Sequence, residues 1–300
     1  MFEVNVIAYN GFIPVIDPSN GSMMLYLSPK GQSNNSTNRN IWYDYTKHYP
    51  AILTDMYYGS GNGWSQDLDG TPYLNLTSGG KLSIPNFYPF AEDPTKKSAT
   101  NSAMGSGMTI ELDFEISGVT DYNAELIKCI SKTEVNSAIA VGFSITGKTA
   151  KFYNNNKNGY DGKSALTSIP LNENKRIRLS FVIEPNKYNP DKQTEKYYPM
   201  LLTYLNGIIS NAVIYDEVND KFVDNLFEQA VLTMDSTHAQ IKIYGIRFYS
   251  TALKPRNILN NYTASLPTLA EKEKRAYSND VYDSENNISY KEVSADDYDL

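Results

Sequence analysis

Two runs of the chain alternate between apolar and polar residues with a period of two, and this pattern constrains the fold more than any other feature. In MTIELDFEI, residues 108–116, every apolar residue stands at an even-numbered position. In RIRLSFVIE, residues 176–184, apolar residues stand at 177, 179, 181 and 183. Such alternation is typical of β-strands that turn one face toward a hydrophobic core.

Two further runs predict strands together with their turns. MLLTYLNGIISNAVIY, residues 200–215, is apolar on both sides of Asn206-Gly207. That dipeptide favours a two-residue hairpin because both residues tolerate positive φ. QIKIYGIRFYS, residues 240–250, alternates except at Gly245, where a bulge or a close packing contact is expected. Turn-rich segments separate these runs and helical patterns do not, so the sequence predicts an all-β, antiparallel two-sheet sandwich.

Helix is expected only near the C-terminal end of the chain. KPRNILNNYTA, residues 254–264, is expected to form one or two turns. SLPTLAEKEKRAYS, residues 265–278, starts with Ser265 as an N-cap-like residue and continues with good helix formers. The sequence therefore predicts a sandwich with a short helical C-terminal extension.

The predicted domain organisation has one main domain, over residues 23–263. Residues 1–22 are predicted to be a linker or the end of a preceding module, and residues 264–300 a helical and acidic extension. The N-terminal segment lacks the pattern of a signal peptide and reads as strand-like sequence from its start. This suggests a piece of a longer protein.

Charge and composition exclude several classes of partner. The 300 residues carry a formal net charge of −7 and contain no run rich in Lys and Arg, so a nucleic-acid partner is not expected. No stretch of about 20 apolar residues occurs, so membrane insertion is not expected either. The single cysteine, Cys129, lies in strand-like sequence and is predicted to be an inert core residue.

Several motifs resemble those of concanavalin A-like, laminin-G-type jelly-roll domains. IYGIRFYSTALKPRNILNNY, residues 243–262, resembles their closing strand and helical turn, and YLNG, residues 204–207, resembles one of their hairpins. A closer resemblance, over roughly residues 23–290, is to such domains in bacteriophage tail and baseplate proteins. It is based on NGWSQDLDGTPYLNLTSGGKLSIPNFYPF, GMTIELDFEISGVTDYNAELIKCIS, KRIRLSFVIE and NDVYDSENNISY.

This resemblance implies a non-enzymatic virion protein, or a fragment of one, located in a phage tail or baseplate. Its jelly roll would bind a host-surface glycan or serve in assembly with other virion subunits, and the protein would be a homo-oligomer. A secreted adhesin domain that binds polysaccharide outside the cell is an alternative, weakened by the missing signal peptide. The family contains glycan-binding and purely structural members, so the fold does not decide between these functions.

A catalytic alternative depends on Glu111, Asp113 and Glu115. Their E-x-D-x-E pattern resembles retaining glucanases that share the jelly roll, which implies Glu111 as nucleophile, Glu115 as acid/base and Asp113 as the residue that tunes them on a concave face. However, residues i and i+4 of a flat strand are about 13 Å apart at Cα, whereas retaining hydrolysis needs carboxyls about 5–5.5 Å apart. A retaining glycoside hydrolase is therefore the runner-up, and a solvated strand face explains the same pattern.

The best candidate for a glycan site is the loop YYGSGNGWSQDLDG, residues 57–70, with Trp42 upstream. Aromatic faces pair with the apolar C–H surfaces of sugars, and amide and carboxylate groups bond hydroxyls. The carbohydrate-binding candidates are Trp42, Tyr57, Tyr58, Asn62, Trp64 and Asp67. The alternative is that Trp64 plugs the end of the sandwich beneath a Gly-rich turn.

The sequence assigns no metal site and no cofactor. Asp67-Leu68-Asp69-Gly70 is compatible with calcium, but an EF-hand loop is absent and a turn explains the same residues. His48 and His238 are the only histidines, and no Cys/His spacing supports zinc.

Overall fold

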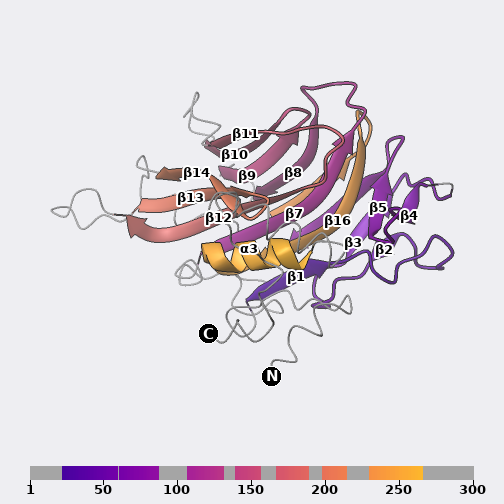
Figure 1. The fold of residues 1–300 in the computed structure, drawn as a ribbon, viewed down its shortest axis with the longest axis horizontal. Coiled ribbons are helices and arrows are strands. Elements are labelled where there is room, and N and C mark those ends of the chain that lie inside the picture. Colours follow the sequence, from indigo (N-terminus) through magenta and orange to yellow (C-terminus); the bar gives the residue numbers. More distant parts are fainter. Residues whose placement is uncertain are drawn as a thin grey trace, which may run out of the picture.

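The computed structural model describes residues 22–59, 61–87, 107–131, 139–156, 167–188, 198–214 and 230–265. These residues form two eight-stranded sheets and one short helix (Figure 1). Every strand pair is antiparallel, and the predicted all-β two-sheet sandwich is thereby confirmed. Among these residues no helix is long and apolar enough to cross a membrane.

The sheet that carries the two alternating runs, called sheet A here, has them as neighbouring central strands. In spatial order its strands are β14 (Ile208–Ile214), β13 (Tyr198–Leu205), β12 (Ile177–Tyr188), β7 (Met108–Ser117), β16 (Gln240–Tyr249), β5 (Pro72–Leu76) and β4 (Gly63–Gln66). The eighth strand, β1 (Met23–Leu27), pairs with the second half of β16, whereas β5 pairs with the first half. β1 and β5 therefore lie along the same edge of β16, one after the other.

The second sheet, called sheet B, covers one face of sheet A. In spatial order its strands are β11 (Thr167–Pro170), β10 (Thr149–Asn156), β9 (Ile139–Thr146), β8 (Glu125–Ser131), β15 (Ala230–Asp235), β6 (Lys81–Phe87), β3 (Ala51–Thr54) and β2 (Ile41–Trp42). In Figure 1, β8 to β11 are seen above β12 and β13 of sheet A.

The core lies between the two sheets, where the sequence pattern placed it. All apolar residues at the alternating positions of β7 and β12 belong to one buried cluster with residues of sheet B. Phe181 of β12 stacks on Phe143 of β9, with ring centroids 4.9 Å apart, which joins the sheets directly. Cys129 is fully buried in the same cluster, as predicted, and burial raises the pKa of its thiol.

The two predicted turn features are confirmed. Asn206 and Gly207 have φ values of 54° and 80° and connect β13 to β14 as a two-residue hairpin. The pairing of β16 with β7 shifts register between Ile243 and Gly245, so a bulge lies at the glycine that interrupts the alternation.

Helix α3 (Pro255–Ala264) lies across the outer face of sheet A, opposite sheet B (Figure 1). It confirms the position of the helix predicted over 254–264, and with ten residues it is longer than the predicted one or two turns. Ile258 of the helix and Leu253 before it are buried in a second apolar cluster with Val182, Leu202, Tyr204 and Tyr249 of the sheet. Sheet A is therefore covered on both faces over its central strands.

The helix crosses the predicted domain boundary at residue 263. Ser265, predicted as the N-cap of a further helix, is the C-cap of α3, with its backbone N–H 3.0 Å from the carbonyl oxygen of Tyr262. The rest of the predicted helix over 265–278 lies outside the described residues, as do nearly all of the predicted segments 1–22 and 264–300.

Candidate functional site

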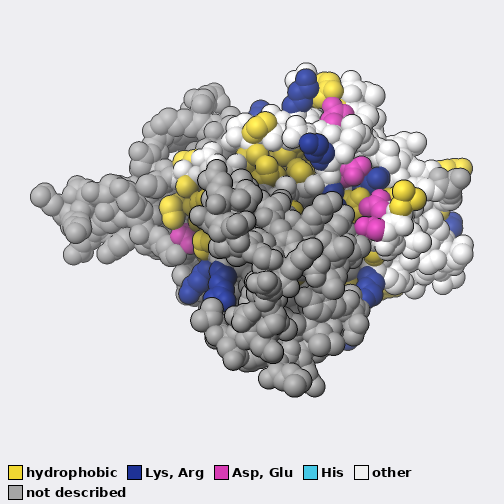
Figure 2. Space-filling view, viewed as in Figure 1, with side chains coloured by type: hydrophobic (Ala, Val, Ile, Leu, Met, Phe, Trp, Pro, Cys, Tyr) yellow, Lys and Arg dark blue, Asp and Glu magenta, His cyan; other side chains and the backbone are white. Residues whose placement is uncertain are grey.

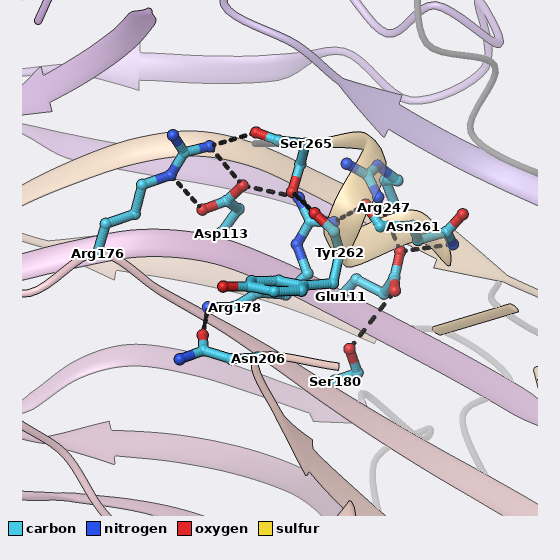
Figure 3. A network of polar contacts seen from close by, with 10 residues as sticks. All are labelled: Glu111, Asp113, Arg176, Arg178, Ser180, Asn206, Arg247, Asn261, Tyr262 and Ser265. Carbon is cyan, nitrogen blue, oxygen red and sulfur yellow. Dashed lines mark hydrogen bonds and ion pairs between the residues drawn. The ribbon is translucent and has the colours of Figure 1, made fainter. Parts of the chain in front are cut away.

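Glu111, Asp113 and Glu115 occupy the outer face of sheet A, as their alternation predicts. The first two side chains are nevertheless buried, with relative exposures of 1% for Glu111 and 3% for Asp113. Arg178 of β12, Arg247 of β16 and Asn261 of helix α3 lie around them (Figure 3). The expectation that all three carboxylates line an open face therefore fails for Glu111 and Asp113.

Asp113 accepts hydrogen bonds from two guanidinium groups. Arg176 donates from Nε and Nη2 to the two carboxylate oxygens, both at 2.9 Å, and Arg178 donates from Nη2 at 2.7 Å. Burial alone would raise the pKa of Asp113, but the charges and hydrogen bonds of Arg176 and Arg178 outweigh it and lower the pKa to about 2. The carboxylate of Asp113 therefore stays ionised until the pH falls to about 2.

Glu111 connects the sheet to the helix. Its Oε2 accepts from Arg247 Nη1 and from the Asn261 side-chain amide, both at 3.0 Å. Arg178 Nη1 donates to the Asn261 carbonyl oxygen at 2.5 Å, and the Asn261 amide also donates to the Tyr249 hydroxyl. One buried asparagine on α3 thus bonds to groups from strands β7, β12 and β16.

Glu115 lies farther along β7 and is less buried. Lys242 Nζ lies 3.2 Å from Glu115 Oε1 and 3.7 Å from Asp67 Oδ1. Figure 2 shows acidic and basic side chains next to each other near the β5 end of this face. All three carboxylates of the glucanase-like pattern are thus held by cationic side chains of the protein itself.

A pocket of about 980 Å³ lies on the outer side of sheet A, beside the ion pairs of Glu111 and Asp113. It lies between the loop after β1, the β4–β5 turn, strand β16 and the end of α3. We call it the tyrosine pocket, defined by its lining residues Tyr26, Ser28, Pro29, Lys30, Gly31, Gln32, Ser33, Asn34, Asn35, Tyr45, Trp64, Ser65, Gln66, Asp69, Gly70, Thr71, Pro72, Asp113, Arg176, Tyr244, Arg247, Ala264 and Ser265.

Aromatic rings and cations alternate around this pocket. The rings of Tyr26 and Tyr45 lie 5.3 Å apart, and Tyr45 is half exposed at 51%. Arg247 lies over Tyr26 at 5.2 Å, and Arg176 lies over Tyr244 at 3.9 Å, measured to the ring centroids. Such contacts orient a guanidinium and keep part of it away from water.

The tryptophans proposed as sugar platforms are packed inside. Trp42 has no exposed surface, and its Nε1 donates to the Ser28 carbonyl at 2.9 Å. Because its ring offers no face to a ligand, the prediction that Trp42 binds a sugar is wrong. Trp64 is 7% exposed and meets Trp42 edge to face at 5.2 Å. Trp64 therefore acts mainly as a plug, with one edge on the tyrosine pocket.

The other predicted residues are divided between the pocket and its surroundings. Tyr57 is 64% exposed but does not line the pocket, and Tyr58 bonds through its hydroxyl to Asn40. Asn62 Oδ1 accepts from the Thr77 hydroxyl. Asp67 lies just outside the lining and accepts from the Tyr244 hydroxyl at 2.9 Å, which orients that ring.

Sequence reasoning missed most of the pocket. Tyr26, Tyr45, Tyr244, Arg176 and Arg247 come from four separate parts of the chain, and none belongs to the loop that was singled out. The available signal was weak: Arg247 and Arg176 are charged residues at the outward positions of strand-like runs.

Among the described residues, no group of three or more His, Cys, Asp and Glu side chains could hold a metal ion. In the segment considered for calcium, Asp67 accepts from Tyr244, and Asp69 Oδ1 accepts from the Thr71 backbone N–H at 2.8 Å. Gly70 donates its N–H to the Asp67 carbonyl and has φ +84°, which are features of a turn.

No protein-family model and no curated protein matches the chain. A solved structure described as HCR/D-Sa-GBL1/C is similar with a TM-score of 0.51 and 12% identity, covering 82% of this chain and 52% of that one. The binding domain of botulinum neurotoxin serotype D/C VPI 5993 gives a TM-score of 0.49 at 12% identity, covering 82% and 52%. The binding domain of botulinum neurotoxin DC in complex with SialylT gives 0.47 at 13% identity, again covering 82% and 52%.

At this level of identity the likeness shows the fold alone. The chain spans about half the length of the solved domains that it matches. None of these three structures is described as a phage protein.

Proposed function

We propose that this chain is a non-catalytic β-sandwich module that binds a saccharide in the tyrosine pocket. The observation that carries the proposal is the pocket itself, in which several aromatic rings stand among amide side chains and charged groups. A sugar ring offers apolar C–H surface to an aromatic face and hydroxyls to amides, so this combination fits its two kinds of surface.

Tyr45 is the ring best placed to receive a sugar. It is half exposed, lines the pocket, and is supported from behind by Tyr26. Gln32, Asn34 and Gln66 provide hydrogen-bonding groups on the walls. Asn34 is already fixed, because its Oδ1 accepts from the Trp64 backbone N–H at 2.7 Å.

The positions of the carboxylates favour a non-catalytic role. A retaining glycosidase needs a nucleophile that reaches the anomeric carbon and a second carboxyl close to it. Glu111 is 1% exposed and bonded to Arg247 and Asn261. A nucleophile in that environment would have to break its contacts with α3 before it could touch a substrate.

The setting of the module is part of the proposal. The segments that resemble phage tail and baseplate domains support a place in a virion, where the pocket would meet a host-surface glycan. Other virion subunits would be its partners, and a homo-oligomer is the proposed state. Mass spectrometry of purified particles tests this, because recovery only from the particle-free medium would favour the secreted adhesin instead.

A glycan array with the wild-type protein and two tyrosine variants tests the binding function. Tyr45→Ala removes a pocket ring and should abolish the signal on every bound glycan. Tyr57→Ala is the matched control, because Tyr57 is even more exposed but stands outside the pocket lining. It should bind as the wild type does.

Two results would count against the proposal. Loss of binding in Tyr57→Ala with binding kept in Tyr45→Ala would move the site to the loop that follows β3. No binding to any glycan would reject the function altogether. Release of reducing sugar from a bound glycan would instead support the hydrolase, provided that Glu115→Gln, at the less buried of the two glutamates, stops it.

A further inference from the structure

The buried ionic cluster beside the tyrosine pocket contains an excess of one positive charge. It comprises two carboxylates and three guanidinium groups, which belong to Glu111, Asp113, Arg176, Arg178 and Arg247. Asp113 is shared between Arg176 and Arg178, and Glu111 is paired with Arg247. The chain as a whole carries a net charge of −7, so this local excess is opposite in sign to the protein.

Repulsion within the cluster acts on Arg178, its most buried arginine. Burial lowers the pKa of Arg178, and the positive charge of Arg247 lowers it further. Burial acts in the same direction on Arg176 and Arg247, but Asp113 and Glu111 outweigh it there and raise the pKa values of these two arginines. Beyond the Tyr244 ring, Lys242 faces Asp67 and Glu115, and that group has one negative charge in excess. The excess positive charge therefore lies on the side of the pocket that Arg176 and Arg247 line.

Arg247 has hydrogen-bonding capacity that the protein does not use. Its Nη1 donates to Glu111, but its buried Nε has no acceptor. A buried donor without a partner costs about 1–3 kcal/mol, and the residue is only 5% exposed. Arg176, in contrast, uses the edge formed by Nε and Nη2 to bind Asp113. Arg247 also lines the tyrosine pocket, so the part of its guanidinium that reaches the pocket surface is the part that an anion would contact.

The surroundings of Arg247 prepare it for an anion. Tyr26 lies under its guanidinium, and Arg176 and the exposed Lys30 line the same pocket. Rings and ion pairs hold the two guanidinium groups in place, so little side-chain entropy is lost when a ligand binds. Asp69 is the carboxylate at the rim, and its Oδ1 is engaged by the backbone of Thr71.

We propose that the saccharide bound in the tyrosine pocket carries an anionic group, a carboxylate or a sulfate, which Arg247, Arg176 and Lys30 receive while the sugar ring rests on Tyr45. This inference depends on the proposed function and names its ligand class.

A glycan array that contains neutral, uronic-acid, sialylated and sulfated glycans tests the ligand class. Binding should be confined to anionic glycans, and the uronic-acid and sulfated sets distinguish a carboxylate from a sulfate. Binding to neutral glycans alone, still lost in Tyr45→Ala, would overturn this inference and leave the proposed function intact. No binding to any glycan would reject both.

Variants then test which residues receive the anion, using the strongest anionic glycan and its carboxyl-reduced or desulfated form. Arg247→Lys keeps the charge opposite Glu111 but loses the planar fork, and should weaken binding about tenfold or more. Lys30→Gln, on the surface loop, should weaken it about threefold. Lys148→Gln is the control, on the β9–β10 turn away from the pocket, and should bind unchanged.

The measurement is isothermal titration calorimetry at two salt concentrations, about 50 mM and about 500 mM, because salt screens exposed charge pairs. Affinity should fall with salt for the anionic glycan and stay constant for its neutral form. If Arg247→Lys fails to fold, Lys30→Gln still decides the question. Equal affinity of wild type and Lys30→Gln, without any salt dependence, would refute the role of charge.

Discussion

Arg247 Nη1 lies 3.0 Å from Glu111 Oε2, and the two side chains are only 6% and 1% exposed. This pair stands at the point where β7, β16 and α3 meet, because Glu111 also accepts from Asn261 of the helix. Removing one partner of such a pair leaves the other charge buried without compensation, which costs much more than the net contribution of the intact pair.

Replacing Glu111 should therefore destabilise the fold strongly. We expect Glu111→Ala to lower the free energy of unfolding by about 3–5 kcal/mol, measured by urea denaturation followed by tyrosine fluorescence and circular dichroism. Glu125→Ala is the control, because Glu125 pairs with Lys128 at the surface with 41% of its side chain exposed. It should cost less than about 1 kcal/mol. Similar losses in the two variants would contradict the buried role of Glu111.

The fold was predictable because its signals are local. Alternation in β7 and β12 identifies which side chains enter the core, and Asn206-Gly207 identifies a hairpin from two residues alone. Gly245 marks the bulge in β16 by interrupting the pattern. Each of these signals depends on neighbours within a few positions, so it can be recognised without knowledge of the tertiary structure.

The candidate site was not predictable because it depends on contacts between distant segments. Alternation places Glu111 on the outer face of sheet A, but it cannot show that Asn261, 150 positions later, covers that face. Tyr26 and Tyr244 meet in one pocket although most of the chain separates them. Trp64 suggested a sugar platform because its ring offers a flat aromatic face, yet that large apolar surface is stabilised by packing on Trp42.

The ion pairs of Asp113 predict a loss of stability in acid. The pKa of this carboxyl falls from an ordinary value of 3.8 to about 2 in the folded protein. A lowered folded-state pKa adds stability above the unfolded value, and this stability is lost as pH falls toward 2. By linkage the loss should be about 2 kcal/mol between about pH 5 and about pH 2.

Asp113→Asn removes the titrating group, so its stability should fall by about 2 kcal/mol less than that of the wild type over this range. The measurement is urea denaturation at a series of pH values. Asp55→Asn, at an exposed position after β3, should keep the wild-type slope. A variant Asp113→Asn with an unchanged slope would show that the two arginines do not set this pKa.

A substitution at Gly207 tests whether α3 packs on the β13–β14 hairpin. Its φ is +80°, and a Cβ added there would lie 3.0 Å from Leu259 Cδ1 and 3.1 Å from Tyr262 Cβ, both on the helix. Gly207→Ala therefore combines backbone strain with a clash against α3. We expect a loss of about 2–3 kcal/mol in the free energy of unfolding.

Gly118→Ala provides the matched comparison, since Gly118 has φ +60° and no atom within 4 Å of an added Cβ. It should lose only the backbone contribution, about 1 kcal/mol. The difference between the two variants therefore measures the contact with the helix. If urea denaturation shows the same loss of unfolding free energy in both variants, α3 does not pack on the hairpin in solution. The burial of Glu111 beneath the helix would then be contradicted as well.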